Sequence, residues 1–257
     1  MRLGCCAYSY RDALNSGDLD LNGFLHKCVD MKLDGVELTA YYFKDLSREA
    51  LLDTKMKAYR MGLQVSGTAV GNAFTSPDAD HRRSQVQMVL DWIDHSVTLG
   101  APGLRVFAGS IHDGTTERQA FDWTVECLKE CCARATDRGV MIALENHGGI
   151  TSTAEQTLAL LNAVGSDWMG LNLDVGNFAG DPYSQIERAA SFAVTAHAKV
   201  SAAGSPLDFD RIVQILAKAG YCGYLNVEYE EPGDAGVGVP AFMEVLAKAL
   251  ANAGVRP

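Results

Sequence analysis

The chain has 257 residues and a net charge of −10, from 22 Lys and Arg against 32 Asp and Glu. This balance argues against a nucleic-acid-binding protein, whose affinity rests on basic patches that neutralise phosphates. The 47% hydrophobic and 21% charged content excludes a disordered chain. The N-terminal apolar stretch is broken by Arg11 and Asp12, and no run reaches the roughly 18 residues that span a bilayer. We therefore expect a cytoplasmic protein with no nucleic-acid or membrane partner.

Short apolar segments alternate with longer amphipathic segments eight times along the chain. The expected strands are 3–7, 35–39, 63–68, 103–107, 140–145, 169–174, 194–199 and 223–228. The expected helices lie near 20–31, 47–61, 77–99, 116–138, 153–164, 184–192, 208–219 and 239–253.

Residues typical of helix ends support these assignments. Ser76 before Pro77 predicts a helix start, and Thr116 to Gln119 and Ser152 to Glu155 have the spacing of capping boxes. Four glycines follow predicted helices, where a C-terminal cap favours positive φ: Gly62, Gly100, Gly139 and Gly220.

Strands that alternate with helices of this length predict a parallel sheet. Eight units in about 250 residues fit a single (β/α)8 TIM barrel covering 1–257. The structural alternative is a doubly wound open sheet, which usually carries a glycine-rich phosphate loop after its first strand. Here the first strand runs into Ala7-Tyr-Ser-Tyr10, which lacks such glycines. The seven cysteines are expected to be reduced thiols, and Cys127 and Cys131 to be small buried side chains rather than a metal or redox pair.

The last four predicted strands each end with a residue that can bind a metal. These residues are Glu145, Asp174, His197 and Glu228, separated by about one strand-and-helix unit each. Side chains two apart lie on one face of a strand, and the opposite faces are mostly apolar, as in Ile142 and Leu144. We therefore expect all four side chains to point into the mouth of the barrel, where the functional residues of TIM barrels collect.

Three carboxylates and one imidazole at one point would repel one another without a cation. Oxygen-rich ligation with one His suits one divalent ion, with Mn²⁺ expected first and Mg²⁺, Co²⁺, Fe²⁺ or Zn²⁺ as alternatives. Taken alone, an acid at the end of a strand is more often a helix cap or a solvated charge, and a lone His197 is more often a structural histidine. The prediction rests on all four occurring together.

These segments resemble the metal-site motifs of the xylose isomerase-like TIM-barrel superfamily. The resemblance is carried by Glu145-Asn-His-Gly-Gly, Asn172-Leu-Asp174-Val-Gly-Asn177, His197-Ala-Lys199 and Val227-Glu228. Its members include ketose 3-epimerases, inosose and dehydroshikimate dehydratases and the endonuclease IV group. Its specific part covers 141–230.

The resemblance implies a role for each matching residue. Glu145, Asp174, His197 and Glu228 would bind the metal, and Glu145 and Glu228 would also move protons. The implied reaction is a sugar or cyclitol isomerisation or epimerisation, by α-proton abstraction through a metal-bound enediolate. His147, two residues after Glu145, resembles the His beside the metal in the dehydratases and is a further catalytic candidate.

Five other residues are candidates for substrate binding. They are Lys199, Asn177, Glu37, Arg105 and Tyr8. Lys199 lies on the same strand face as His197, so its side chain should point into the mouth and could bind a substrate. A salt bridge to Glu228 or Glu230 is an equal alternative. Many ketose 3-epimerases have His at the position of Asn177. This difference argues against assigning the chain as a simple ketose epimerase. Glycines and acids in the segment 230–239 predict a mobile loop at the mouth.

Three other functions stay open from the sequence. The main alternative is a metal-dependent lyase, a dehydratase or hydratase acting on a keto sugar or keto acid. A non-catalytic subunit that keeps the fold is a second. An abasic-site endonuclease is disfavoured by the acidic charge and by the histidines, because those relatives use a three-zinc cluster with several further His ligands and this chain has only six His in all. The expected partner is a small sugar or keto-sugar substrate, and family members are often homodimers or homotetramers.

Overall fold

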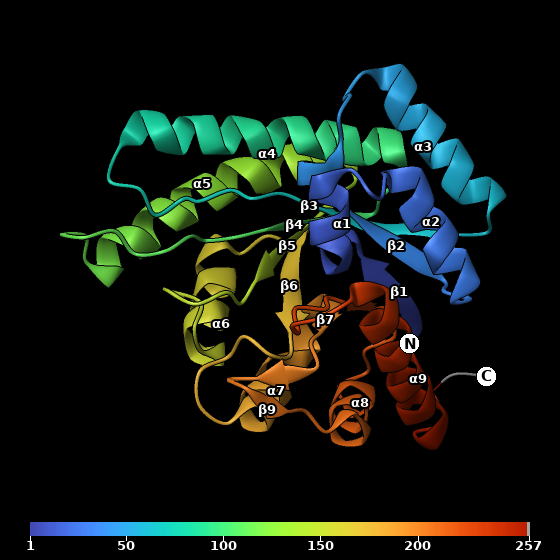
Figure 1. Cartoon of the computed structure of the whole chain (residues 1–257). Helices are drawn as coiled ribbons and strands as arrows, with labels where there is room; N and C mark the ends of the chain where they lie inside the picture. Colours follow the sequence, from blue (N-terminus) through green and yellow to red (C-terminus); the bar gives the residue numbers. More distant parts are fainter. Residues whose placement is uncertain (256–257) are drawn as a thin grey trace.

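The computed structural model describes residues 1–255 and shows eight parallel strands closed into a barrel with helices outside it (Figure 1). Around the barrel the strands follow the order β1-β10-β7-β6-β5-β4-β3-β2. Their bounds are β1 Arg2–Cys6, β2 Gly35–Thr39, β3 Gln64–Ala69, β4 Gly103–Val106, β5 Met141–Glu145, β6 Met169–Asp174, β7 Ala193–Ala198 and β10 Tyr224–Val227. The predicted (β/α)8 barrel is confirmed.

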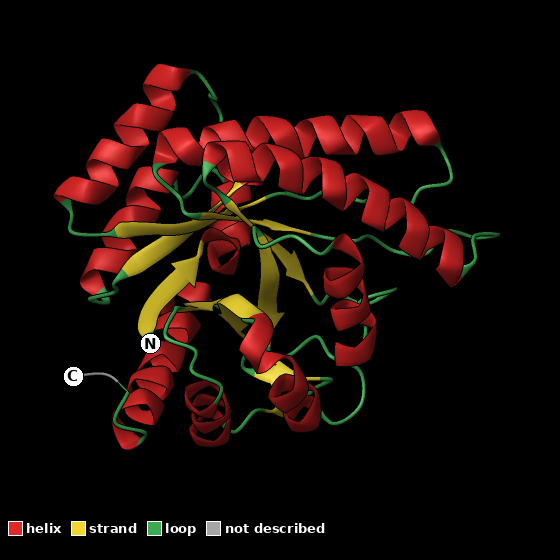
Figure 2. Cartoon of the chain, turned by 180° about the vertical axis from the view of Figure 1, so that it is seen from behind, coloured by secondary structure: helices red, strands yellow, loops and turns green. Residues whose placement is uncertain are grey.

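The helices form the outer layer, which Figure 2 shows from behind. The α-helices are α1 Arg11–Ser16, α2 Leu21–Asp30, α3 Arg48–Arg60, α4 Ala79–Leu99, α5 Glu117–Arg138, α6 Ala154–Val164, α7 Pro182–Ala189, α8 Phe209–Lys218 and α9 Ala235–Asn252. Short 3₁₀ helices follow β1 (η1, Ala7–Tyr10) and β2 (η2, Ala40–Tyr42) and precede β7 (η3, Ala190–Phe192). No helix among residues 1–255 is long and apolar enough to cross a membrane.

The barrel closes between its first and last strands. Leu3 pairs with Leu225, and the N-terminal ammonium of Met1 donates to the carbonyl of Val255 at 3.0 Å. Inside the barrel, Gly4 faces Asn226, and a Cβ at Gly4 would lie 2.1 Å from the Oδ1 atom of Asn226. Only glycine fits at this position, because the polar side chain of Asn226 fills the interior beside it.

The two faces of the strands differ as the alternation predicted. Ile142 and Leu144 on β5 are fully buried in the hydrophobic core that the strands share with the helices. The other face of β5 carries Met141, Ala143 and Glu145, and the first two line a small interior cavity of about 80 Å³. Glu145 therefore projects from the interior face at the carboxyl end of the strand.

Several predicted boundaries are wrong by a few residues, each for a local reason. Helix α4 begins at Ala79 instead of 77, because the side chain of Asp78 caps it by accepting from the N–H of Asp80. Ser152 does not cap α6, because its hydroxyl donates to Gly149; the capping box is formed by Thr153 and Gln156.

The segment 230–239 is also shorter as a loop than predicted. Asp234 caps α9, which begins at Ala235, so only the stretch before Asp234 is a loop. Three features were not predicted: α1 with its preceding 3₁₀ turn, the 3₁₀ helix η2, and a two-stranded hairpin of β8 (Ser201–Ala202) and β9 (Ser205–Pro206). The capping box from Thr116 to Gln119 and the positive φ at the four predicted glycines are confirmed.

Candidate metal centre

Four potential ligand residues meet at the carboxyl end of the barrel. Glu145 ends β5, Asp174 ends β6, His197 lies in β7, and Glu228 directly follows β10. One ligand atom from each lies within 4.8 Å of the others, and all four residues are buried. The parallel strands bring these ends to one edge, as the parity of the sequence predicted.

Asp174 is fixed so that one carboxylate oxygen faces the centre of this cluster. Its Oδ1 atom accepts from the N–H of Gly176 at 2.8 Å, and Asn146 bonds both the N–H and the carbonyl of Asp174. Its Oδ2 atom is buried without a hydrogen bond in the described chain, and lies 3.4 Å from Lys199 Nζ. Burial raises the pKa of Asp174 to about 8.

Glu145 is surrounded by donors on three sides. Arg105 Nε lies 3.2 Å from its Oε2 atom, and Asn172 donates to the same oxygen at 2.7 Å. Asn177 donates to Oε1 at 3.4 Å. Burial raises the pKa of Glu145, and Arg105 opposes that shift. These contacts thus fix the orientation of the Glu145 carboxylate, while Arg105 offsets only part of the effect of its burial.

His197 contacts acids through both ring nitrogens. Nε2 lies 2.9 and 3.1 Å from the two carboxylate oxygens of Glu37, on the far side of the barrel interior. Nδ1 lies 3.6 Å from Glu145 and 3.5 Å from Glu228. Burial alone would lower the pKa of His197, but Glu37 and Glu228 raise it well above its usual value. A proton on Nε2, held by Glu37, leaves Nδ1 as the atom that a metal would take.

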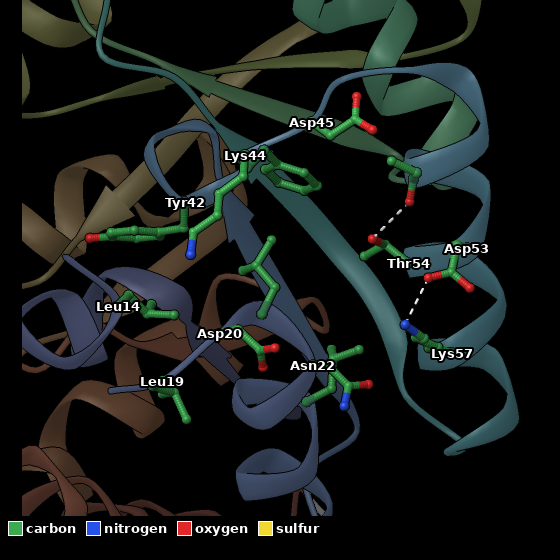
Figure 3. A pocket seen from close by; sticks show the side chains of 14 residues that line it. Leu14, Leu19, Asp20, Asn22, Tyr42, Lys44, Asp45, Asp53, Thr54 and Lys57 are labelled. Atoms are coloured by element: carbon green, nitrogen blue, oxygen red, sulfur yellow. Dashed lines mark hydrogen bonds and ion pairs between the residues drawn. The ribbon is translucent and has the colours of Figure 1, made fainter. Parts of the chain in front are cut away.

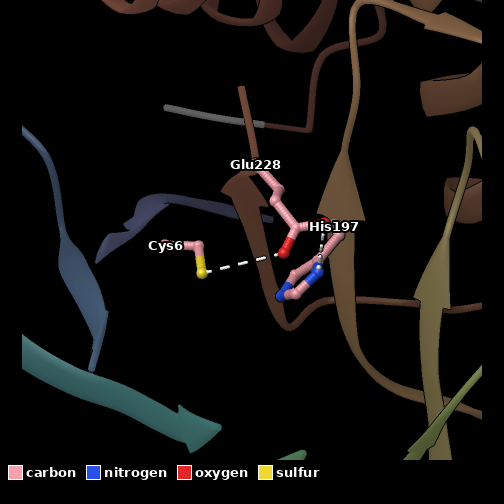
Figure 4. Close-up of side chains that lie close together, drawn as sticks. All are labelled: Cys6, His197 and Glu228. Atoms are coloured by element: carbon pink, nitrogen blue, oxygen red, sulfur yellow. Dashed lines mark hydrogen bonds and ion pairs between the residues drawn. The ribbon is translucent and has the colours of Figure 1, made fainter. Parts of the chain in front are cut away.

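Glu228 lies between His197 and Cys6, as Figure 4 shows. Burial alone would raise the pKa of Glu228, but His197 and Lys199 lower it below its usual range. Cys6 Sγ lies 4.0 Å from Glu228 Oε1 and 3.6 Å from the hydroxyl of Thr39. Cys6 was not among the predicted site residues, although its parity with Gly4 on the first strand would have placed it inside the barrel.

The rim of the mouth carries aromatic and polar side chains. The rings of Phe107 and His147 lie 4.6 Å apart, and Arg105 stacks on Phe107 at 3.9 Å. Tyr8 is half-buried, with Arg11 over its ring. Phe107 was missed as a site residue, because on the sequence it reads as the apolar end of the fourth strand. Tyr10, which follows β1 as Tyr8 does, is buried against Phe24.

The five candidate substrate-binding residues divide into two groups. Glu37 and Arg105 are buried behind the candidate ligands and contact His197 and Glu145. Lys199 and Asn177 lie at the mouth beside Asp174, Glu228 and Glu145, and Tyr8 lies in the adjoining turn. Contact with a substrate remains a prediction for all five, as does a catalytic role for His147.

A separate cavity of about 240 Å³ lies beside α2 and α3 (Figure 3). Leu14, Asp20, Tyr42, Lys44 and Thr54 are among the side chains that line it. None of its described lining residues is a candidate ligand or a candidate substrate contact, so we do not assign the predicted chemistry to it.

The donor set fits a divalent cation. Three carboxylates and one neutral imidazole are ligands that Mn²⁺, Fe²⁺, Co²⁺ and Zn²⁺ accept in proteins. The buried Asp174 Oδ2 atom has no hydrogen bond in the described chain, as expected of an atom reserved for a metal. Glu37 supplies the carboxylate that typically orients a metal-binding histidine.

We expect Glu37→Gln to lower metal affinity about 10- to 100-fold, because the amide no longer holds the Nε2 proton of His197 by a charge-assisted bond. Titration of the metal-free variant with Mn²⁺ measures this effect. Glu231→Gln is the matched control, since it removes an acid that bonds Ser201 and is not a candidate ligand. Equal affinity in the native chain and Glu37→Gln would contradict this role of Glu37.

Metal binding at pH 6.5 is expected to release protons. In the metal-free chain, burial raises the pKa of Asp174 to about 8, so this carboxyl is mainly protonated at that pH, whereas a ligand must be ionised. Metal affinity should therefore rise as the pH increases through 8, because His197, whose pKa is raised well above its usual value, must also lose its Nδ1 proton to bind the metal. Calorimetry in two buffers of different ionisation enthalpy counts the protons released. Binding without proton release at pH 6.5 would contradict the raised pKa of both Asp174 and His197.

Comparisons with known proteins agree with this architecture. The family model described as xylose isomerase-like TIM barrel matches residues 25–249. Curated protein sequences gave no match. Among solved structures, an L-ribulose 3-epimerase aligns with a TM-score of 0.81 and 19% identity, covering 99% of this chain and 97% of the other.

Two further structures show the same fold. The IolI protein with a bound zinc atom aligns with a TM-score of 0.77 and 20% identity, covering 98% and 97% of the two chains. The 3-keto-D-glucoside 4-epimerase YcjR from E. coli aligns with a TM-score of 0.75 and 15% identity, covering 90% and 94%. At these identities the structures establish a shared fold, and the family model covers most of the chain. The chain therefore belongs to the xylose isomerase-like TIM barrel family.

Proposed function

We propose that this chain is a divalent-metal-dependent isomerase or epimerase of a sugar or cyclitol. The observation that carries the proposal is the cluster of Glu145, Asp174, His197 and Glu228, with one ligand atom of each within 4.8 Å of the others. The epimerases among the structural neighbours support the same class of reaction. Mn²⁺ is the ion we expect first, and a homodimer or homotetramer is the assembly we expect.

Glu145 and Glu228 are the proposed proton carriers. They lie 3.6 and 3.5 Å from His197 Nδ1, at the end of β5 and directly after β10, so both carboxylates can reach a small substrate bound at the cluster. One carboxylate removes the proton from the carbon beside the substrate carbonyl. The other returns a proton to the opposite face, which epimerises the carbon, or to the neighbouring carbon, which isomerises the sugar.

The bound cation would supply Lewis acidity for the enediolate charge and would offset the mutual repulsion of the carboxylates. The protein chain orients the reacting carboxylates and surrounds them with a buried environment of low dielectric constant. Arg105 and Asn172 hold Glu145 by its Oε2 atom, and Asn177 adds a donor at Oε1. Because these groups are already in place, no rearrangement of solvent is needed when charge develops.

The rim supplies surfaces suited to a polyhydroxy substrate. Phe107 and Tyr8 offer aromatic faces, and His147 is exposed beside Phe107 with ring nitrogens that can bond a hydroxyl. We propose Asn177, Tyr8 and His147 as the contacts that orient the substrate. Glu37 and Arg105, which are buried behind the candidate ligands, are proposed as residues that position His197 and Glu145.

Exchange of substrate hydrogen with solvent tests the proposed reaction. The chain is loaded with Mn²⁺ and incubated in D₂O with a panel of keto sugars and keto cyclitols, and deuterium is located by NMR. Deuterium at the carbon beside the carbonyl, with a new stereoisomer or shifted carbonyl, supports an isomerase or epimerase. Loss of water with an enone absorbance identifies the lyase instead. Absence of exchange across the panel with metal bound would refute the proposed reaction.

A further inference from the structure

Lys199 is the cation at the mouth of the barrel, and it is enclosed by acids. Its Nζ atom lies 2.6 Å from Glu230, 3.3 Å from Glu228 and 3.4 Å from Asp174. It also donates to Asn177 Oδ1 at 3.1 Å. Its side chain is only 8% exposed. The charge of Lys199 is therefore shared among carboxylates of the protein itself.

The contact with Glu230 differs from the other two. Asp174 and Glu228 are candidate metal ligands, so their charge is directed to a cation when one is bound. Glu230 is not part of that set, makes the shortest of the three contacts and is 40% exposed. When a divalent ion takes Asp174 and Glu228, Glu230 remains as the carboxylate that neutralises Lys199.

The loop that carries Glu230 is held in place on both sides. Arg11 donates to the carbonyl of Tyr229 at 2.8 Å, and Ser201 of the β8–β9 hairpin donates to Glu231 at 2.7 Å. Glu230 is thus positioned by its neighbours, and a second acid stands beside it. The pairing with Lys199 is supported by the surrounding backbone as well as by the attraction of the charges.

Two other cations of this region are also engaged. Arg105 is buried against Glu145 and the carbonyl of Val70. Arg11 is bonded to Tyr229 and stacked on Tyr8. A carboxylate or phosphate entering the mouth would meet Glu230, and Arg105 and Arg11 already have partners. Like charges brought together in a partly desolvated site discriminate strongly against a ligand.

We infer that Glu230 neutralises Lys199 and thereby makes the site selective for uncharged polyhydroxy carbonyl compounds over keto acids and sugar phosphates. The inference rests on the proposed function, since it names the substrate class of the same site. Glu230 acts as a specificity-determining residue through Lys199. Removing its charge frees an ammonium group at the mouth, and that group then accepts an anionic substrate.

The test compares two ligands that differ in one group. One is a 2-ketohexose, and the other is the corresponding uronate, in which a carboxylate replaces the C6 hydroxymethyl group. Calorimetry gives the Kd of each ligand for the Mn²⁺-loaded native chain, Glu230→Gln and the control Glu231→Gln. The ratio of the two Kd values isolates the effect of charge, because metal chelation by the shared keto-alcohol end is common to both ligands.

We expect the native chain to bind the ketohexose more tightly, and Glu230→Gln to shift the ratio toward the uronate by about tenfold or more. Glu231→Gln should shift the ratio less than Glu230→Gln, because Glu231 bonds Ser201 instead of Lys199. Tighter binding of the uronate by the native chain would overturn the inference. So would an unchanged ratio in a Glu230→Gln variant that is folded and loaded with metal.

The binding measurement also distinguishes a failure of this inference from a failure of the proposed reaction. Absence of solvent exchange, together with the expected shift of the Kd ratio toward the uronate in Glu230→Gln, would refute the reaction and retain the charge selection. Solvent exchange on the ketohexose, together with an unchanged ratio in that variant, would retain the reaction and refute the role of Glu230.

Discussion

Asp174→Ala is expected to abolish stoichiometric metal binding. The substitution removes a buried carboxylate of the candidate ligand cluster, and the Oδ2 atom of this carboxylate has no hydrogen bond in the described chain. Loss of one of four ligands should lower the affinity for Mn²⁺ by at least about 100-fold, beyond the 10- to 100-fold typical of residues that only orient a ligand. Elemental analysis of the purified native and variant chains, after incubation with Mn²⁺ and gel filtration, measures the metal content directly.

Two controls make this result specific. Asp174→Asn keeps the Oδ1 atom that accepts from Gly176 and so preserves the local turn, yet it should also lose the metal because the charge is gone. Asp113→Ala removes an exposed acid from a loop and should retain about one metal ion per chain. Full metal content in Asp174→Asn would show that this carboxylate is not a ligand.

Glu145→Gln and Glu228→Gln are each expected to reduce solvent exchange of the substrate proton by about 10³-fold or more. A proton carrier in the transition state contributes about 10²- to 10⁴-fold, and here each residue would also hold the metal. The measurement is deuterium incorporation at saturating Mn²⁺, with metal content determined on the same samples. Saturating metal separates the loss of the proton carrier from the loss of the ion.

The control for this pair is Glu231→Gln, which lies near the mouth and should exchange at a rate close to that of the native chain. Exchange at the native rate in either Glu145→Gln or Glu228→Gln would remove that residue from the proposed proton path. If only one of the two variants exchanges at the native rate, both proton transfers would be assigned to the carboxylate that this variant keeps.

The barrel and the meeting of the four candidate ligand residues followed from the sequence because both depend on periodicity. Alternation along the strand placed Glu145 and Asp174 on the interior face, and parallel strands carry their ends to one edge. Family resemblance then supplied roles for residues that the pattern had brought together. A pattern of this kind is insensitive to errors of one or two residues in a strand boundary.

The partners of the ligand residues could not be predicted in the same way. The bond between His197 and Glu37 joins residues 160 apart in the chain, and its direction depends on rotamers. The capping of α6 by Thr153 instead of Ser152 was decided by a competing bond from Ser152 to Gly149. In both cases several polar residues were available, and three-dimensional packing selected among them.

The bond between Glu37 and His197 also has a mechanical consequence for the whole barrel. It connects β2 to β7, which are separated by β1 and β10 around the ring, so it links two non-adjacent strands across the interior. Arg105 on β4 adds a second tie, to Glu145 on β5. The candidate ligands come from the later half of the chain, whereas Glu37 and Arg105, which hold two of them, come from the earlier half. We therefore expect a bound metal ion to strengthen the contact between the two halves and so to stabilise the closed ring as a unit.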